Sequence, residues 1–250
     1  MVKLNVLDLF SGIGMFSYGL EKTGFYKTVQ FVEWNEKCQE VLKKNFEGVP
    51  IHGDIATFTN NTNQVDIIVG GFPCQDISIA NQTAEGISGD RSSYWKDFAR
   101  LIEENKPKGV IIENVSALLS RGLNVVLADL AKIGYDAEWH CITAKNFGAC
   151  HTRDRIFIIA YPSTIRMERK CELSVPSFEG QRRQSVKEDL QQIYSNPFGQ
   201  SSSIPKPLLR RVDDECPDRV DRIKQLGNTV YNPIVEHLGY YLKDIIDGKA

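Results

Sequence analysis

Residues 3–14 read KLNVLDLFSGIG, a β-rich run that leads directly into a turn containing two glycines. The apolar residues favour a buried strand, and Gly12 and Gly14 let the backbone bend tightly and let a ligand approach the helix that follows. Ser17 stands where the dinucleotide-binding fingerprint has its third glycine or an alanine. The stretch therefore predicts a nucleotide-type site without a complete pyrophosphate cradle.

Further β-rich runs alternate with helical patterns along the next 150 residues. The alternation predicts an α/β fold with a doubly wound, mostly parallel sheet of seven strands. Apolar spacing in residues 232–246 predicts a C-terminal helix that packs back on this domain. The other expected strands are 27–34, 49–55, 65–71, 108–115, 137–144 and 155–161, and the expected helices between them are 35–46, 93–106 and 123–133.

The composition changes after residue 161. Residues 162–216 are rich in Ser, Gln, Arg and Pro with weak periodicity, so we expect a small, loop-rich insertion between two parts of one large domain, 1–161 and 217–250. The chain has a formal net charge of -2, yet residues 163–211 hold nine Lys and Arg against five Asp and Glu. This segment suits contact with phosphates, and it equally suits a solvated surface.

Bulk properties exclude several classes of protein. The 42% hydrophobic and 25% charged composition is that of an ordinary globular chain. The first residues lack the features of a signal peptide, and no apolar run approaches the length of a membrane span, so a cytoplasmic protein is expected. The six cysteines form no Cys-x-x-Cys pair and do not cluster with the four histidines, which predicts free thiols and no metal.

Acidic and aromatic residues stand at successive strand ends. Glu33 ends the second predicted strand, 19 residues beyond Gly14, where a carboxylate can accept hydrogen bonds from both ribose hydroxyls. Trp34 offers a face for an adenine ring, and Asp54 can accept from an exocyclic amine. One such acidic residue is more often a helix cap, but three strand ends together predict an adenosine pocket.

Cys74 and Glu113 provide reactive groups at the same edge of the sheet. Cys74 follows the fourth predicted strand, with Pro73 stiffening its approach, and Glu113 lies near the end of the fifth strand. A lone cysteine is usually a small buried hydrophobe. Beside a carboxyl group and an adenosine pocket, however, a thiolate can add to carbon 6 of cytosine and make carbon 5 nucleophilic. A protonated Glu113 at ring nitrogen 3 would neutralise the developing charge.

The ordered blocks of the sequence resemble those of the cytosine-5 DNA methyltransferases over residues 4–161 and about 217–246. The blocks are DLFSGIG (8–14), EW (33–34), GDI (53–55), GFPCQ (71–75), ENV (113–115), a basic block at 151–155 and QLGNTV (225–230). The resemblance implies the methyltransferase form of the seven-stranded sheet and S-adenosylmethionine as cofactor. It also implies that the cofactor contacts are Asp8, Phe10, Ser11, Gly12, Ile13, Gly14, Glu33, Trp34, Asp54, Ile55, Pro73, Asn228 and Val230.

The same resemblance assigns the reacting pocket. Cys74, Glu113, Arg153 and Arg155 are the implied catalytic residues, with Arg155 beside the base carbonyl and Arg153 near Cys74. Phe72, Pro73, Asn114 and Val115 are the implied lining of the base pocket. The family usually has Gln-x-Arg-x-Arg where this chain has His151-Thr152-Arg153-Asp154-Arg155, so both arginines are kept and the first position differs.

The expected partner is duplex DNA. Carbon 6 of a stacked cytosine is out of reach of a side chain, so the base must rotate out of the helix. Residues 76–93 are placed to close over the base, and a mobile surface loop is the alternative interpretation of this segment. The short interval 162–216 is the expected target-recognition region. Its length is compatible with a short or relaxed target sequence, or with help from a partner protein. A cognate restriction endonuclease is a further expected partner, and the protein is expected to be a monomer.

Three alternatives remain open. A transfer RNA cytosine-5 methyltransferase would share nearly every block. A catalytically inactive methyltransferase-like DNA-binding module is a second alternative, which the presence of all four catalytic residues disfavours. A nicotinamide oxidoreductase is disfavoured by the absent third glycine and by the Phe-Pro-Cys block. Methylation of an exocyclic amine would require an Asn/Asp-Pro-Pro-aromatic block, and the nearest match at 196–198 lacks the second proline.

Overall fold

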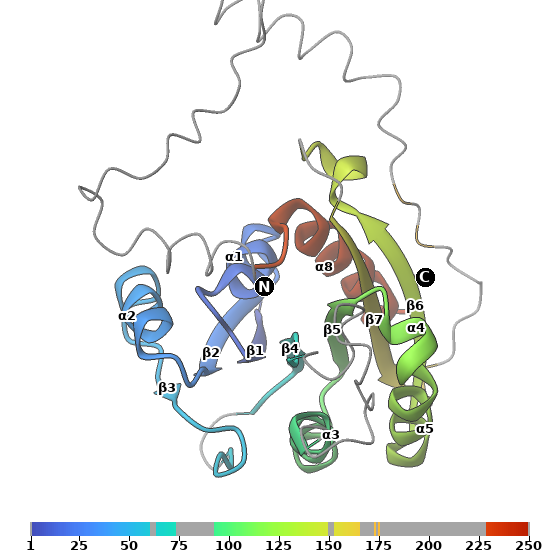
Figure 1. The fold of residues 1–250 in the computed structure, drawn as a ribbon, viewed down its shortest axis with the longest axis horizontal. Helices are drawn as coiled ribbons and strands as arrows, with labels where there is room; N and C mark the ends of the chain where they lie inside the picture. Colours follow the sequence, from blue (N-terminus) through green and yellow to red (C-terminus); the bar gives the residue numbers. More distant parts are fainter. Residues whose placement is uncertain are drawn as a thin grey trace, which may run out of the picture.

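A computed structural model of the chain describes residues 2–60, 64–73, 93–149, 153–165, 173, 175 and 229–249. Its centre is a seven-stranded sheet in the order β3-β2-β1-β4-β5-β7-β6 (Figure 1). All neighbouring strands are parallel except β7, which runs antiparallel to both β5 and β6. The predicted doubly wound, mostly parallel sheet is confirmed. The strands are β1 (Leu4–Leu9), β2 (Tyr26–Val32), β3 (Ile51–His52), β4 (Ile67–Gly70), β5 (Gly109–Val115), β6 (Tyr135–Thr143) and β7 (Asp154–Pro162).

Helices cover both faces of the sheet, α1 and α8 on one face and α3 and α5 on the other (Figure 1). The two predicted helices 123–133 and 232–246 have the predicted bounds, whereas the four-residue helix α4 and the 3-10 turn η3 were not predicted. The helical elements are α1 (Met15–Lys22), α2 (Glu36–Asn45), α3 (Ser93–Asn105), α4 (Leu118–Arg121), α5 (Leu123–Ile133), η3 (Ala144–Phe147) and α8 (Asn232–Ile246). Among the helices of these described stretches, none has the length and apolar character needed to cross a membrane.

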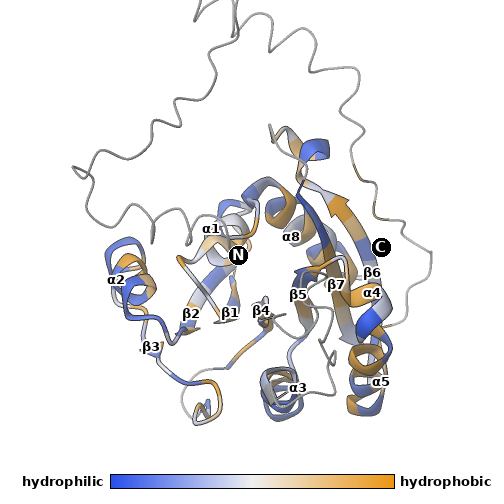
Figure 2. Ribbon diagram, in the orientation of Figure 1, coloured by the Kyte–Doolittle hydropathy of each residue, from blue (hydrophilic) through white to orange (hydrophobic). Residues whose placement is uncertain are grey.

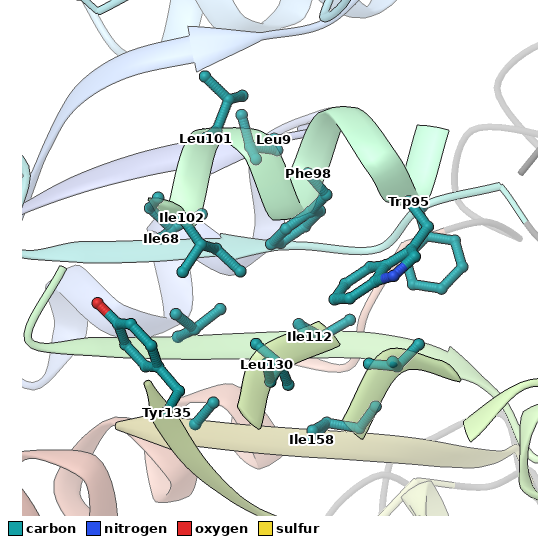
Figure 3. Packing of buried hydrophobic residues seen from close by; sticks show 14 of the residues in the cluster. Leu9, Ile68, Trp95, Phe98, Leu101, Ile102, Ile112, Leu130, Tyr135 and Ile158 are labelled. Atoms are coloured by element: carbon teal, nitrogen blue, oxygen red, sulfur yellow. The ribbon is translucent and has the colours of Figure 1, made fainter. Parts of the chain in front are cut away.

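Alternating side chains of the strands supply two cores. Leu9, Ile68, Ile112 and Ile158 point toward α3 and α5 and are buried there, as Figure 3 shows. Their sequence neighbours on the same strands join α1 and α8 on the opposite face. In Figure 2 α2 is largely hydrophilic, whereas α5 carries both kinds of residue, as expected of a helix with one face on a core.

Close backbone approach fixes the C-terminal helix against the sheet domain. A Cβ at Gly239 of α8 would lie 2.9 Å from Leu20 of α1, and a Cβ at Gly19 of α1 would lie 2.8 Å from Val235. The buried hydroxyl of Tyr26 donates to the carbonyl of Gly239 at 2.6 Å. α8 therefore packs against α1 and against Tyr26 of β2.

Candidate active site

Strand direction brings the candidate residues to one edge of the sheet. The parallel strands β1 to β5 all end at this edge, and the antiparallel strand β7 begins there. The chain order reverses between β1 and β4, which makes this the switch point where open α/β sheets bind ligands. The segments 10–14, 33–34, 53–55 and 71–73, together with the last residues of β5 and the first of β7, are accordingly neighbours.

The carboxyl group of Asp8 lies entirely inside the protein at the end of β1. Its Oδ2 accepts hydrogen bonds from the Ser17 hydroxyl at 2.6 Å and the Ser17 amide at 3.3 Å. Its Oδ1 is buried and has no hydrogen-bond partner among the described residues. Burial raises the pKa of Asp8 to about 7, opposed by the bonds from Ser17. Ser17, which replaces the third glycine of the dinucleotide motif, is therefore the partner of this carboxyl group.

The two glycines of the turn have different roles. Both have positive φ, 54° at Gly12 and 84° at Gly14. A Cβ on Gly14 would lie 2.5 Å from Phe46 and 2.8 Å from Leu42, so this glycine makes room for α2. A Cβ on Gly12 would meet no atom within 4 Å. Gly12 thus borders open space, and Ile13 lies between the two glycines.

Phe10 adopts a left-handed conformation, with φ of 52°, that side chains rarely adopt. The centroid of its ring lies 5.7 Å from that of Tyr94, edge to face, and 6.5 Å from that of Phe98, on which it stacks. Two aromatic residues of α3 therefore pack against Phe10. Backbone strain of this kind persists where the surrounding structure over-determines it, and it clusters at ligand sites. The sequence did not indicate Tyr94 or Phe98 as supports of the site, because their spacing showed only a helix.

Glu33 connects the end of β2 to the glycine turn. The side chain is 7% exposed, its Oε2 accepts from the Gly12 amide at 2.7 Å and its Oε1 from the Asn35 amide at 2.8 Å. Burial raises its pKa, and these backbone bonds oppose the rise. Trp34 beside it is 80% exposed, so its indole face is accessible. Each carboxylate oxygen keeps a second lone pair for a ligand hydroxyl.

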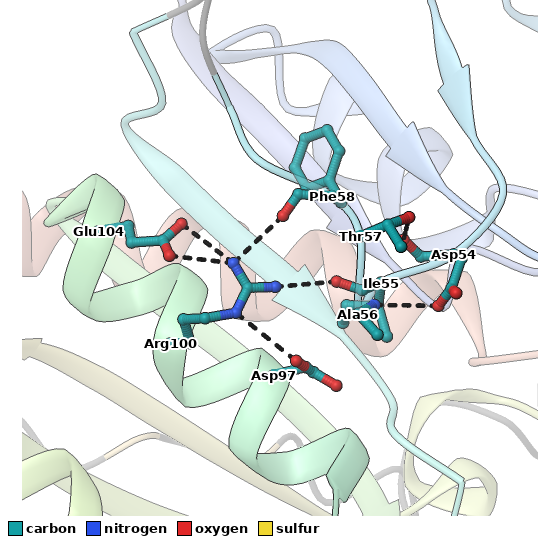
Figure 4. A network of polar contacts seen from close by, with 8 residues as sticks. All are labelled: Asp54, Ile55, Ala56, Thr57, Phe58, Asp97, Arg100 and Glu104. Carbon is teal, nitrogen blue, oxygen red and sulfur yellow. Dashed lines mark hydrogen bonds and ion pairs between the residues drawn. The ribbon is translucent and has the colours of Figure 1, made fainter.

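The segment after β3 carries Asp54 and Ile55. Asp54 is exposed, and its Oδ1 accepts from the Ala56 amide at 3.0 Å in a local turn. Ile55 is 4% exposed and its carbonyl accepts from Arg100 of α3 at 2.9 Å (Figure 4). Arg100 was not identified from the sequence.

Glu113, Arg153 and Arg155 come together between β5 and β7. Glu113 pairs with Phe157 and Val115 with Arg155, so the side chains of Glu113 and Arg155 share one face of the sheet. The Nε of Arg155 lies 2.8 Å from Oε1 of Glu113, and Nη2 of Arg153 lies 4.0 Å from the same oxygen. The structure thus brings three of the four predicted catalytic residues into one cluster.

Burial is the largest cause of the pKa shifts of Glu113 and Arg153. It raises the pKa of Glu113, although the charges of Arg155 and Arg153 and the Arg155 contact lower it. Burial and the neighbouring Arg155 lower the pKa of Arg153, while Glu113 opposes that shift. Gly71 leaves the space that the carboxyl group occupies, since a Cβ there would lie 2.8 Å from Oε2 of Glu113.

Asn114 connects the predicted base pocket to the β4 loop. The amide is 2% exposed; its Nδ2 donates to the Phe72 carbonyl at 3.3 Å and its Oδ1 accepts from the Val115 amide at 2.8 Å. The Phe72 ring is 5% exposed and packs on Trp95 of α3, whereas Pro73 is exposed. The Phe72 ring is therefore part of the core against α3 rather than an exposed lining of the site.

Several predicted residues lie outside the described part of the chain. These are Cys74, Asn228, His151, residues 76–92 and most of the interval 162–216. Val230, the last predicted cofactor contact, is 8% exposed and belongs to the core beneath α8. Within the described ranges, no three His, Cys, Asp or Glu side chains gather as a metal site would require, and Cys38 and Cys141 are free thiols.

The sequence matches one family model over most of its length. The family is described as C-5 cytosine-specific DNA methylase, and the match covers residues 4–215. This chain belongs to that family. The predicted resemblance to cytosine-5 DNA methyltransferases is confirmed.

Individual relatives of this chain are named type II methyltransferases. M.BsuFI of Bacillus subtilis is 30% identical over 254 residues, which cover 97% of this chain and 60% of the relative. M.HhaI of Haemophilus parahaemolyticus is 33% identical over 170 residues, which cover 66% of this chain and 51% of the relative. The chain spans about half the length of the curated relatives it matches.

Solved structures share the fold of this chain. A protein described as a prophage-encoded DNA modification methyltransferase (E. coli) superposes with a TM-score of 0.59 at 26% identity, covering 70% of this chain and 51% of the other. Spodoptera frugiperda DNMT2 superposes with a TM-score of 0.57 at 19% identity, covering 70% and 54%. The second likeness is one of fold alone.

Proposed function

We propose that this chain transfers a methyl group from S-adenosylmethionine to carbon 5 of cytosine in duplex DNA, with Cys74 as the transient nucleophile. The buried Glu113 carboxyl group, held 2.8 Å from Arg155 and raised in pKa by burial, is the observation that carries the proposal. A carboxyl group whose pKa is raised binds a proton more readily than an exposed glutamate does, which suits protonation of ring nitrogen 3. The relatives named type II methyltransferases support the choice of DNA.

The residues at the ends of β1 to β3 fit S-adenosylmethionine. Glu33 has spare acceptor lone pairs for ribose hydroxyls, Trp34 offers a largely exposed ring for the adenine, and Gly12 borders open space. Asp54 is exposed after β3, where its carboxyl group can accept a hydrogen bond from the adenine amine. When bound, the cofactor supplies an electrophilic methyl group. In this proposal Phe10, Ile55, Pro73 and Asn228 complete its surroundings.

The proposed roles of the protein side chains follow from the reactivity of cytosine. The Cys74 thiolate forms a bond to carbon 6 while Glu113 gives its proton to nitrogen 3, which raises the electron density at carbon 5. Arg155 and Arg153 hold the Glu113 carboxyl group and the base carbonyl. After methylation, carbon 5 loses its proton to water, the bond from carbon 6 to sulfur breaks and nitrogen 3 returns its proton to Glu113, which restores the neutral aromatic ring and releases the thiolate.

Recognition of the DNA remains a prediction from the sequence. The base must leave the duplex, and unstacking costs on the order of a few kcal/mol that phosphate and groove contacts must supply. We assign target recognition to residues 162–216. A cognate restriction endonuclease, a cytoplasmic location and a monomeric state complete the proposal.

Two measurements on the full chain test this function. Methyl incorporation is compared between duplex DNA and transfer RNA, and incorporation confined to the RNA would reject DNA as the substrate. Duplex DNA carrying 5-fluorocytosine should become covalently attached to the wild-type chain and not to Cys74→Ala, because fluorine at carbon 5 prevents release of the thiolate. An active wild-type chain that forms no adduct would reject the covalent route.

A further inference from the structure

The segment Asp54–Phe58 is held only weakly by the sheet. It follows β3, which pairs with β2 over just two residues at the sheet edge. Within the segment, the Ala56 amide donates to Asp54 Oδ1 at 3.0 Å and the Thr57 amide donates to the Asp54 carbonyl at 3.3 Å. These bonds shape the turn itself. They do not set its distance from the glycine turn after β1.

Arg100 of α3 connects the segment Asp54–Phe58 to α3. Its Nη2 donates to the Ile55 carbonyl at 2.9 Å and its Nη1 to the Phe58 carbonyl at 3.2 Å (Figure 4). Glu104 lies 3.0 Å from Nη1 and Asp97 lies 3.5 Å from Nε, so carboxylates fix the other side of the guanidinium. A planar guanidinium can make these contacts at once, whereas the single ammonium of lysine cannot reproduce the fork.

α3 also contacts Phe10, which lies in the turn after β1 at the proposed cofactor pocket. Phe98, two residues before Arg100, stacks on Phe10 at 6.5 Å. Phe98 is fully buried and Ile55 is 4% exposed, so both contacts belong to the α3 core. α3 therefore joins the turn after β1 to the turn after β3, two segments that share no direct strand pairing.

We infer that Arg100 is a positioning residue for the cofactor pocket, which it serves by holding the Asp54–Ile55 turn at a fixed distance from Phe10. The inference rests on the proposed binding of S-adenosylmethionine at this edge. Arg100 acts through the backbone of Ile55 and Phe58 and need not touch the ligand. Its loss should weaken binding while the methyl transfer step at saturating cofactor stays intact.

The test compares Arg100→Met with Glu104→Gln in the full chain. Arg100→Met keeps the aliphatic stem and removes both donors to the carbonyls, whereas Glu104→Gln weakens an ion pair with Arg100 and leaves those donors in place. Calorimetric titration with S-adenosylmethionine should give a Kd raised about tenfold or more for Arg100→Met, and within about twofold of wild type for Glu104→Gln. Turnover at saturating cofactor should stay within about threefold of wild type in both variants.

Hydrogen exchange in the ligand-free chain adds a readout that needs no cofactor. The amides of residues 56–58 should exchange faster in Arg100→Met than in wild type, and at the wild-type rate in Glu104→Gln. If Arg100→Met does not fold, Arg100→Lys replaces it, with a smaller rise in Kd expected in the same direction. Unchanged Kd in the folded Arg100 variant, or an equal rise in Glu104→Gln, would overturn the inference. Failure of the wild-type chain to bind the cofactor would instead refute the proposed function.

Discussion

Arg155 Nε lies 2.8 Å from Glu113 Oε1, so an ion pair joins β5 to β7 at the carboxyl edge of the sheet. Two opposing effects act on this carboxyl group, because burial raises its pKa and the arginine charges lower it. Burial is the larger effect. The pair therefore holds in place a carboxyl group that binds a proton more readily than an exposed glutamate does, which is what a general acid requires.

Glu113→Gln should remove this acid while keeping the shape of the side chain. Since proton transfer by a positioned group contributes about 10²- to 10⁴-fold to a rate, we expect methyl incorporation to fall at least about 100-fold. The Kd for S-adenosylmethionine should remain near that of wild type, because Glu113 belongs to the base side of the site. Glu138→Gln on β6 is the matched control and should retain activity. A Glu113→Gln chain with more than a tenth of wild-type turnover would contradict the assignment.

Glu33→Ala should weaken cofactor binding. The substitution removes the proposed ribose acceptor and also the two bonds to the amides of Gly12 and Asn35, which hold the glycine turn. We expect the Kd for S-adenosylmethionine to rise at least about tenfold by calorimetry. Glu36→Ala, an exposed residue in the first turn of α2, is the control and should bind as wild type does. Unchanged affinity in Glu33→Ala would show that the ribose lies elsewhere.

Asp8→Asn should change the pH dependence of stability. Burial raises the pKa of Asp8 to about 7 in the folded protein from its ordinary 3.8. Between pH 4 and 7 the folded chain therefore binds a proton that the unfolded chain has released. The contribution of Asp8 to stability is complete below pH 4 and is lost as the pH rises through 7, at a slope of up to about 1.4 kcal/mol per pH unit.

Urea unfolding of the ligand-free chain at several pH values measures this slope. Asp8→Asn should lose less stability than wild type between pH 4 and 7, because asparagine cannot ionise. The burial-raised pKa values of Glu33 and Glu113 act in the same direction and should leave part of the slope in the variant. Parallel stability curves for Asp8→Asn and wild type would show that Asp8 does not titrate in this range.

Sequence periodicity predicted the long elements better than the short ones. The bounds of α5 and α8 were predicted correctly, because each presents a continuous apolar face to a core. The expected strand 49–55 is reduced to Ile51–His52, since it lies at the sheet edge and its remainder turns toward α3. α4 has only four residues, too few to show a helical period.

The residues of the candidate site also differ in whether the sequence predicts them. Glu33 and Glu113 were predictable because a side chain at a strand end has a known place in a parallel sheet, whereas Arg153 and Arg155 were assigned only from the resemblance to the cytosine-5 DNA methyltransferases. Arg100 was not, because its partners are the carbonyls of Ile55 and Phe58, and backbone acceptors leave no mark on a sequence. Ser17 was noticed only as a departure from the glycine pattern, and its bond to Asp8 requires the turn to be formed first.

Gly71→Ala should disturb Glu113 without replacing any of the proposed catalytic residues. The added methyl group would lie 2.8 Å from Oε2 and 3.2 Å from the carbonyl oxygen of Glu113, so the Glu113 carboxyl group must shift. Overpacking of this kind costs about 1–3 kcal/mol of unfolding free energy. Methyl incorporation should fall with it, while the Kd for S-adenosylmethionine stays near the wild-type value.

A double-mutant cycle with Glu113→Asp separates this clash from a general loss of stability. Aspartate is one methylene shorter and leaves room for the alanine, so Gly71→Ala should destabilise the Glu113→Asp chain less than it destabilises wild type. A coupling free energy of about 0.5 kcal/mol or more, measured by urea unfolding, is expected for residues in contact. Additive effects would mean that Gly71 does not make room for the Glu113 carboxyl group, and that the fall in methylation has another cause.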